Sequence, residues 1–166
     1  MHSLNLFYSS HMKKNKKEQK KRKTEGNKLL RRAGIAIQNE FYLEASWILS
    51  ILIEKKLKKV LGKIENHIPG AGYSLEQSVK RVKYLHVSGR NPQFSGTFDL
   101  RLIDEIRNWK NQRNIILKDM QDVHVSQARM ERLALEGFRL LKEWNRANKK
   151  FRKGTGDGYI KSTFNE

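Results

Sequence analysis

The chain contains no cysteine and very little proline. Its 166 residues include no Cys and only two Pro. The absence of Cys excludes disulfides, thiolate metal ligands and cysteine nucleophiles. It is also compatible with the reducing cytoplasm, where we expect the protein to be located. Since Pro interrupts helices, its scarcity permits long helices.

Long apolar runs are missing as well. No stretch of about 20 apolar residues occurs, so we expect no membrane-spanning helix. The segment Met1–Ser10 is too short and too polar for a secretory signal peptide. A lysine-rich run begins directly after Met12, so both Met1 and Met12 are compatible with the start of translation.

Acidic residues are scarce relative to basic ones. The chain has 17 Asp and Glu residues against 35 Lys and Arg, which gives a formal net charge of +18. From Lys13 to Arg32 there are eleven basic and two acidic residues, and from Arg139 to Lys153 there are seven basic and one acidic. These two segments carry +9 and +6, so most of the net charge lies near the two ends of the chain.

This uneven charge predicts a polyanionic partner. Each Lys or Arg placed on a phosphate releases counterions, so binding is expected to depend on salt and little on base sequence. Lys13–Lys23 contains no apolar residue, and it therefore matches nucleic acid better than a membrane surface. The residues expected to contact nucleic acid are Lys13, Lys14, Lys16, Lys17, Lys20, Lys21, Arg22, Lys23, Arg31, Arg32, Lys149, Lys150, Arg152 and Lys153.

The spacing of apolar residues predicts helices separated by loops. The expected helices cover 29–37, 40–61, 74–87, 97–120 and 126–148. Ser74, with Gln77 three residues later, is typical of a capping box, and Thr97 is a candidate cap for the fourth helix. Gly and Pro residues indicate loops at 62–73 and 88–96.

No alternating strand pattern of useful length occurs. The predicted fold class is therefore all-α, an up-and-down bundle of four or five helices with basic N- and C-terminal extensions. We expect residues 1–26 to form a basic arm without fixed structure, residues 27–150 to form the bundle, and residues 151–166 to form a flexible tail.

Most of the residues with chemical potential are interpreted as structural. Trp47, Trp109 and Trp144 fall on the apolar stripes of the expected helices, so we expect them in the core rather than stacked on bases. His86 lies on the side of a short helix and is expected to pack there. No pair of histidines has metal-ligand spacing, so we expect no metal site and no cofactor.

Two charged residues occupy positions expected to face the core. Arg113 interrupts the apolar stripe of the fourth helix, and Glu54 interrupts that of the long second helix. Buried charges are rare unless paired, so we predict that the Arg113 guanidinium and the Glu54 carboxylate form a pair across the bundle. Such a pair is compatible both with a purely structural salt bridge and with a functional site.

The segment Leu102–Met120, LIDEIRNWKNQRNIILKDM, resembles the motif helix of HEPN domains. In that family an Arg is followed by a polar residue, often Asn, and then by a His about a turn later. Arg113 and Asn114 match the first two of these positions. The segment Leu29–Leu61 is similar to the first two HEPN helices in its pattern of Ala33, Tyr42, Ala45, Glu54 and Leu57.

The resemblance implies a helical bundle that forms a homodimer and acts on RNA in preference to DNA. Many HEPN proteins are metal-independent ribonucleases, in which Arg stabilises charge on phosphorus and His transfers protons. Here Lys118 stands where that His is expected. The resemblance therefore implies catalytic roles for Arg113, Asn114 and Lys118, and it leaves open an endoribonuclease or a non-catalytic relative that only binds.

Two further functions remain open on the sequence. One is a helical interaction module, such as a partner subunit or an antitoxin-like protein, which would bind a protein partner through an exposed apolar patch. The other is an architectural DNA-binding protein that uses only its basic arms.

Overall fold

The computed structural model describes residues 25–65, 73–122 and 125–154. Every regular element in these ranges is a helix, which confirms the all-α bundle expected from the sequence. An N-terminal helix covers residues 25–38. It is followed by α2 (Tyr42–Ile64), α3 (Leu75–Val87), α4 (Pro92–Thr97), α5 (Leu100–Asp122) and α6 (Gln127–Gly154).

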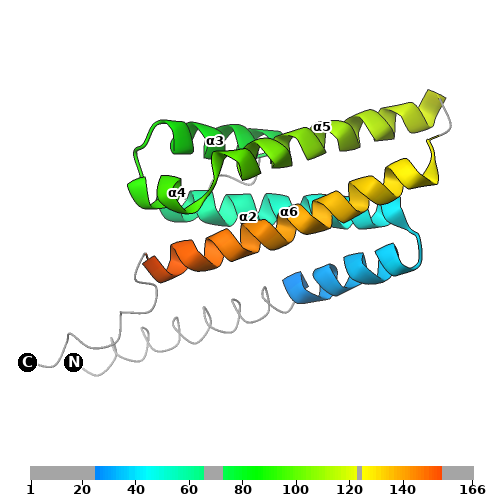
Figure 1. Ribbon diagram of the computed structural model, residues 1–166, viewed down its shortest axis with the longest axis horizontal. Coiled ribbons are helices and arrows are strands. Elements are labelled where there is room, and N and C mark those ends of the chain that lie inside the picture. Colours follow the sequence, from blue (N-terminus) through cyan, green and yellow to red (C-terminus); the bar gives the residue numbers. More distant parts are fainter. Residues whose placement is uncertain (1–24, 66–72, 123–124, 155–166) are drawn as a thin grey trace, which may run out of the picture.

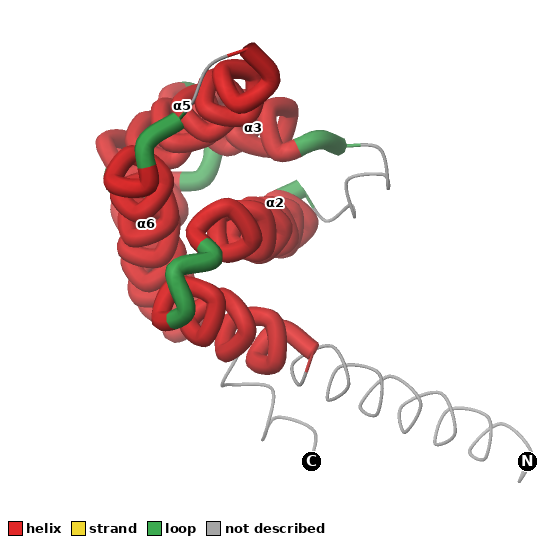
Figure 2. Tube along the Cα trace, turned by 90° about the vertical axis from the view of Figure 1, so that its right-hand side faces the viewer, coloured by secondary structure: helices red, strands yellow, loops and turns green. Residues whose placement is uncertain are grey.

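Four helices, α2, α3, α5 and α6, form the body of the bundle (Figure 1). α5 runs antiparallel to α6. Two ion pairs show this direction, since Arg129 of α6 pairs with Asp119 and Arg139, further along α6, pairs with Glu105. α2 and α6 run in the same direction (Figure 1), and Gln127 at the start of α6 donates a hydrogen bond to Glu40 just before α2. In Figure 2 the N-terminal helix lies on the side of the bundle away from α3 and α5.

α3 runs antiparallel to α5. Lys110 pairs with Glu76 near the start of α3, and Asp104 pairs with Lys83 further along it. α2 and α3 therefore point in the same direction, so this one connection departs from a strict up-and-down order.

The helices expected from the sequence agree well with the structure, but one helix, α4, was not predicted. Ser74 accepts a hydrogen bond from the backbone N–H of Gln77, which confirms the capping box at the start of α3. The expected loop at 88–96, however, contains most of α4. Thr97, predicted to cap the next helix, instead ends α4, and Asp99 accepts a hydrogen bond from the Arg101 N–H at the start of α5. Asn91 and Pro92 are typical of a turn and of a helix start alike.

One end of the bundle is closed by a cluster of aromatic rings. Phe98 lies between Phe94 and Trp144, with ring centroids 4.8 Å and 4.5 Å away. Phe151 joins the cluster and is only 1% exposed. The boundary expected at residue 150 was therefore wrong, because α6 continues to Gly154 and uses Phe151 as a core residue.

The contact between α5 and α6 is close because α6 has a glycine at the crossing. A Cβ atom on Gly137 would lie 2.6 Å from Cζ2 of Trp109. The Trp109 ring occupies this space and donates its Nε1 hydrogen bond to the backbone oxygen of Leu133, 2.8 Å away. Trp109 and Trp144 are buried, as the sequence predicted.

α3 is much shorter than the helices beside it. It has 13 residues, whereas α2 and α5 have 23 each, and its first turn lies level with Lys110 in the middle of α5. The C-terminal part of α5 and the N-terminal part of α2 therefore extend beyond α3 (Figure 1). We call this part the open half, and the part that α3 and α4 cover the closed half.

The open half explains why Trp47 is not in the core. The sequence placed Trp47 on the buried stripe of α2, but its side chain is 55% exposed. Leu57 and Leu61 of the same predicted stripe are fully buried further along α2. Glu65, directly after α2, pairs with Arg81 in the middle of α3, so α3 covers only the C-terminal part of α2 (Figure 1).

Candidate nucleic-acid interface

The predicted pair between Arg113 and Glu54 does not form. Glu54 instead pairs with Lys58, one turn further along α2, at 2.7 Å. The Arg113 guanidinium lies over the Trp47 ring, with its Cζ atom 4.8 Å from the ring centroid. The prediction assumed two closed core positions, whereas the stripe of α2 that carries Glu54 and the stripe of α5 that carries Arg113 are both left partly uncovered by α3.

Arg113 is nevertheless an unusual residue. Its Nε atom is buried and has no hydrogen-bond partner among the residues that the structure describes. Burial also lowers the pKa of Arg113 below its ordinary value, because the charged guanidinium loses solvation. Arg113 therefore stacks on an exposed tryptophan while one of its donors stays unused.

Asn114 and Lys118 do not lie on the same side of α5 as Arg113. Each residue of an α-helix turns by about 100°, so Asn114 is about 100° and Lys118 about 140° away from Arg113 around the axis. Both side chains are exposed. Their spacing from Arg107 and Asn111 puts all four on one polar stripe along the outside of α5.

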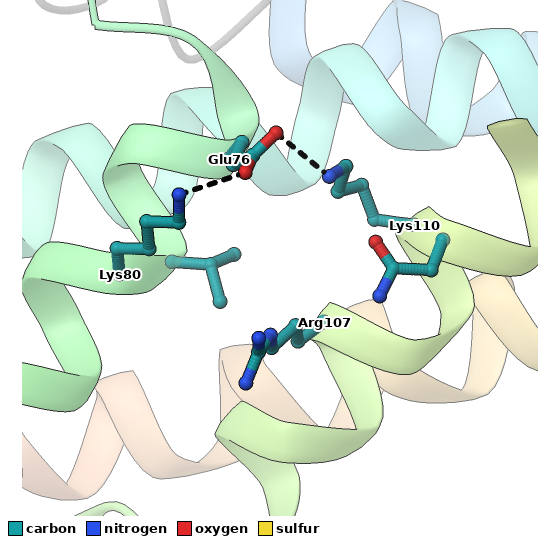
Figure 3. A pocket seen from close by; sticks show the side chains of 6 residues that line it. Glu76, Lys80, Arg107 and Lys110 are labelled. Atoms are coloured by element: carbon teal, nitrogen blue, oxygen red, sulfur yellow. Dashed lines mark hydrogen bonds and ion pairs between the residues drawn. The ribbon is translucent and has the colours of Figure 1, made fainter.

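At the α3 end of this stripe lies a shallow pocket of about 190 Å³ (Figure 3). Glu76 of α3 accepts from two ammonium groups there, Lys80 at 2.9 Å and Lys110 at 3.1 Å. These two bonds lower the pKa of Glu76 to about 2, so its carboxylate stays charged at neutral pH. The residues lining the pocket are Glu76, Val79, Lys80, Arg107, Lys110 and Asn111.

A second basic region lies at the C-terminal ends of α2 and α6. Because these helices run in the same direction, their last turns lie at the same end of the bundle (Figure 1). Burial lowers the pKa of Lys56, and the nearby charges of Lys59 and Arg152 lower it further. We call this region the cationic end; its residues are Lys55, Lys56, Lys59 and Lys63 of α2 and Lys149, Lys150, Arg152 and Lys153 of α6.

Half of the residues of the cationic end were predicted from the sequence. Lys149, Lys150, Arg152 and Lys153 were expected to contact nucleic acid, and all four are exposed. The lysines of α2 were missed, because the net charge summed over the whole central part of the chain combines them with acidic residues elsewhere.

The N-terminal basic residues are less informative. Arg31 and Arg32 are exposed on the N-terminal helix, but Arg32 pairs with Glu44 at 2.7 Å. The predicted contacts in Lys13–Lys23 lie outside the described residues.

The remaining candidates do not form a site. His86 packs against Phe94, and its Nε2 atom lies 2.8 Å from the Phe98 backbone oxygen. Within the described ranges, no group of three or more His, Asp or Glu side chains could hold a metal ion. No helix in those ranges is long and apolar enough to cross a membrane.

Comparison of the chain with models of protein families, with curated proteins and with solved structures finds no significant match.

Proposed function

We propose that this protein binds nucleic acid, RNA in preference to DNA, through the cationic end of the bundle. The observation that carries the proposal is the close approach of Lys56, Lys59 and Arg152, which come from two helices far apart in the sequence. Phosphates along a strand would occupy such a surface and release counterions. The preference for RNA rests on the HEPN resemblance alone.

Basic residues at helix ends also have a structural explanation. Lys and Arg near a helix C-terminus interact favourably with the helix dipole, by roughly 0.3–1 kcal/mol each. Here, however, the charges of Lys59 and Arg152 lower the pKa of Lys56, so basic groups of two different helices lie near one another. Each helix dipole acts on its own last turn and does not by itself explain why basic groups of two helices lie together, whereas a polyanion would contact both.

The test is a salt titration of binding to labelled single-stranded RNA. The variant Lys55→Gln/Lys149→Gln/Lys153→Gln removes three exposed charges from the cationic end. Because each phosphate contact contributes about 0.7 to the slope of log K against log salt on single strands, the slope should fall by about 2.

A matched control removes the same number of charges elsewhere. Arg101, Arg132 and Lys142 are exposed and lie outside the cationic end, so replacing all three with Gln changes the net charge equally. Equal slopes for the two triple variants would reject the cationic end as the binding surface. A protein that binds neither RNA nor DNA would instead favour the helical interaction module.

A HEPN-like ribonuclease is the second candidate, and the unused Nε donor of Arg113 favours it. Against it, Lys118 faces a different side of α5 from Arg113, so one chain does not bring them together. Incubation of the protein with a structured RNA in metal-free buffer decides between cleavage and binding alone. Cleavage that Arg113→Ala abolishes, while RNA binding stays unchanged, would establish the ribonuclease.

A further inference from the structure

The pocket between α3 and α5 holds more positive than negative charge. Lys80, Arg107 and Lys110 contribute three positive charges and Glu76 contributes one negative charge, so the lining carries a net charge of +2. Glu76 is shared between the two lysines. Among the described residues, Arg107 has no ion-pair partner, although it lines the same pocket.

The bonds to Glu76 use only part of the available donors. An ammonium group has three N–H donors and a guanidinium has five. Since Glu76 takes one bond from each of the two lysines, further donors of Lys80 and Lys110 remain, together with those of Arg107. Figure 3 shows Arg107 on the opposite side of the pocket from Glu76 and Lys110.

Lys110 is the best-placed cation of the three. Its side chain is only 12% exposed, whereas that of Glu76 is 50% exposed. The Glu76 carboxylate thus holds Lys110 in position from one side. A charge fixed in this way loses little conformational entropy when a ligand binds.

We propose that this pocket binds a phosphate monoester in its dianionic form. Two negative charges would match the net charge of the lining, and Arg107 would form the paired hydrogen bonds that guanidinium groups make with phosphate oxygens. Lys80 and Lys110 would contact the remaining oxygens, and the amide of Asn111 supplies another donor.

The phosphate could belong to a small molecule or to the 5′ end of a nucleic-acid strand. Asn114 and Lys118 continue the polar stripe beyond the pocket along α5, over about 16 Å from Arg107 at 1.5 Å per residue. This stripe offers a path for a strand whose terminal phosphate occupies the pocket. The pocket is separate from the cationic end, so the two proposals can fail independently.

The experiment titrates the full chain with inorganic phosphate and with a nucleoside 5′-monophosphate, by calorimetry and by backbone amide shifts. The test variant is Arg107→Gln, and the matched control is Arg101→Gln, an exposed arginine on the same helix outside the pocket. Losing a charged hydrogen-bond partner of phosphate should weaken binding about tenfold in the test variant, and the control should bind as the native protein does.

A second arm separates the two sources of phosphate. Tighter binding of a 5′-phosphorylated oligonucleotide than of the same strand with a 5′-hydroxyl, lost in Arg107→Gln, would assign the pocket to strand ends. Binding of the monophosphate with no such preference between strands would assign it to a small ligand.

Two results would overturn the proposal. One is equal affinity of the Arg107→Gln and Arg101→Gln variants for phosphate. The other is amide shifts that appear at the cationic end and not at Lys80, Arg107 and Asn111. Phosphate binding that survives the triple variant of the cationic end would separate this site from the proposed RNA surface.

Discussion

The long helices α2, α5 and α6 run through both the closed and the open half of the bundle, yet the two halves differ in what fills the interior. In the closed half, Phe94, Phe98, Trp144 and Phe151 pack ring against ring and are almost fully buried. In the open half, the interior side of α5 carries Arg113, which stacks on a half-exposed Trp47.

The difference follows from the length of α3. Where α3 and α4 cover the bundle, water is excluded and large apolar rings are stable. Where α3 is absent, a charged side chain with a long aliphatic stem can cover apolar surface and keep its head near water. The interior of the bundle is therefore filled by aromatic rings in the closed half and by a stacked arginine in the open half.

The largest effect is expected when Trp144 of the closed half is compared with Trp47 of the open half. Replacing Trp144 with Ala should lower the free energy of unfolding by about 3–5 kcal/mol, because it leaves a large cavity among aromatic rings. Replacing Trp47 with Ala should lower it by about 1 kcal/mol or less, since mainly an exposed cation–π contact is lost. Urea denaturation followed by circular dichroism measures both values. Similar losses for the two variants would show that the open half is as well packed as the closed half.

An intermediate effect is expected at Arg113. Arg113→Ala should lower the free energy of unfolding by about 1 kcal/mol, because the stacking on Trp47 disappears. Arg113→Met keeps a long side chain and removes the buried, unpaired Nε, so this variant should be at least as stable as the native protein. Thermal unfolding of both variants checks this order. A methionine variant that unfolds as easily as the alanine variant would mean that the charge itself is required.

The smallest expected effect lies at the boundary between the halves, where Glu76 holds Lys80 and Lys110. The pKa of Glu76 is lowered in the folded protein, to about 2. Its contribution to stability is therefore complete above the unfolded pKa of about 4.3 and is lost as the pH falls towards 2. Glu76→Gln should unfold slightly more easily than the native protein at pH 7, and this difference should vanish near pH 2. A difference that is the same at both pH values would show that ionisation of Glu76 is irrelevant.

Much of the local structure could be predicted because it depends on neighbouring residues. The capping box at Ser74 and the burial of Trp109 follow from short-range spacing, and the structure agrees with both. Trp47 lies on an equally convincing stripe, but its exposure depends on where α3 begins. The lysines of α2 likewise form part of a basic surface only because the end of α6 lies beside them.

The sequence by itself determined that the protein is helical, that its helices are long, and that it carries a large positive charge. These properties depend on composition and on the spacing of residues within each helix. Only the tertiary structure decided that Arg113 stacks on Trp47 and that two basic helix ends lie together. Those outcomes depend on the relative lengths and directions of helices, which the pattern within any single helix does not contain.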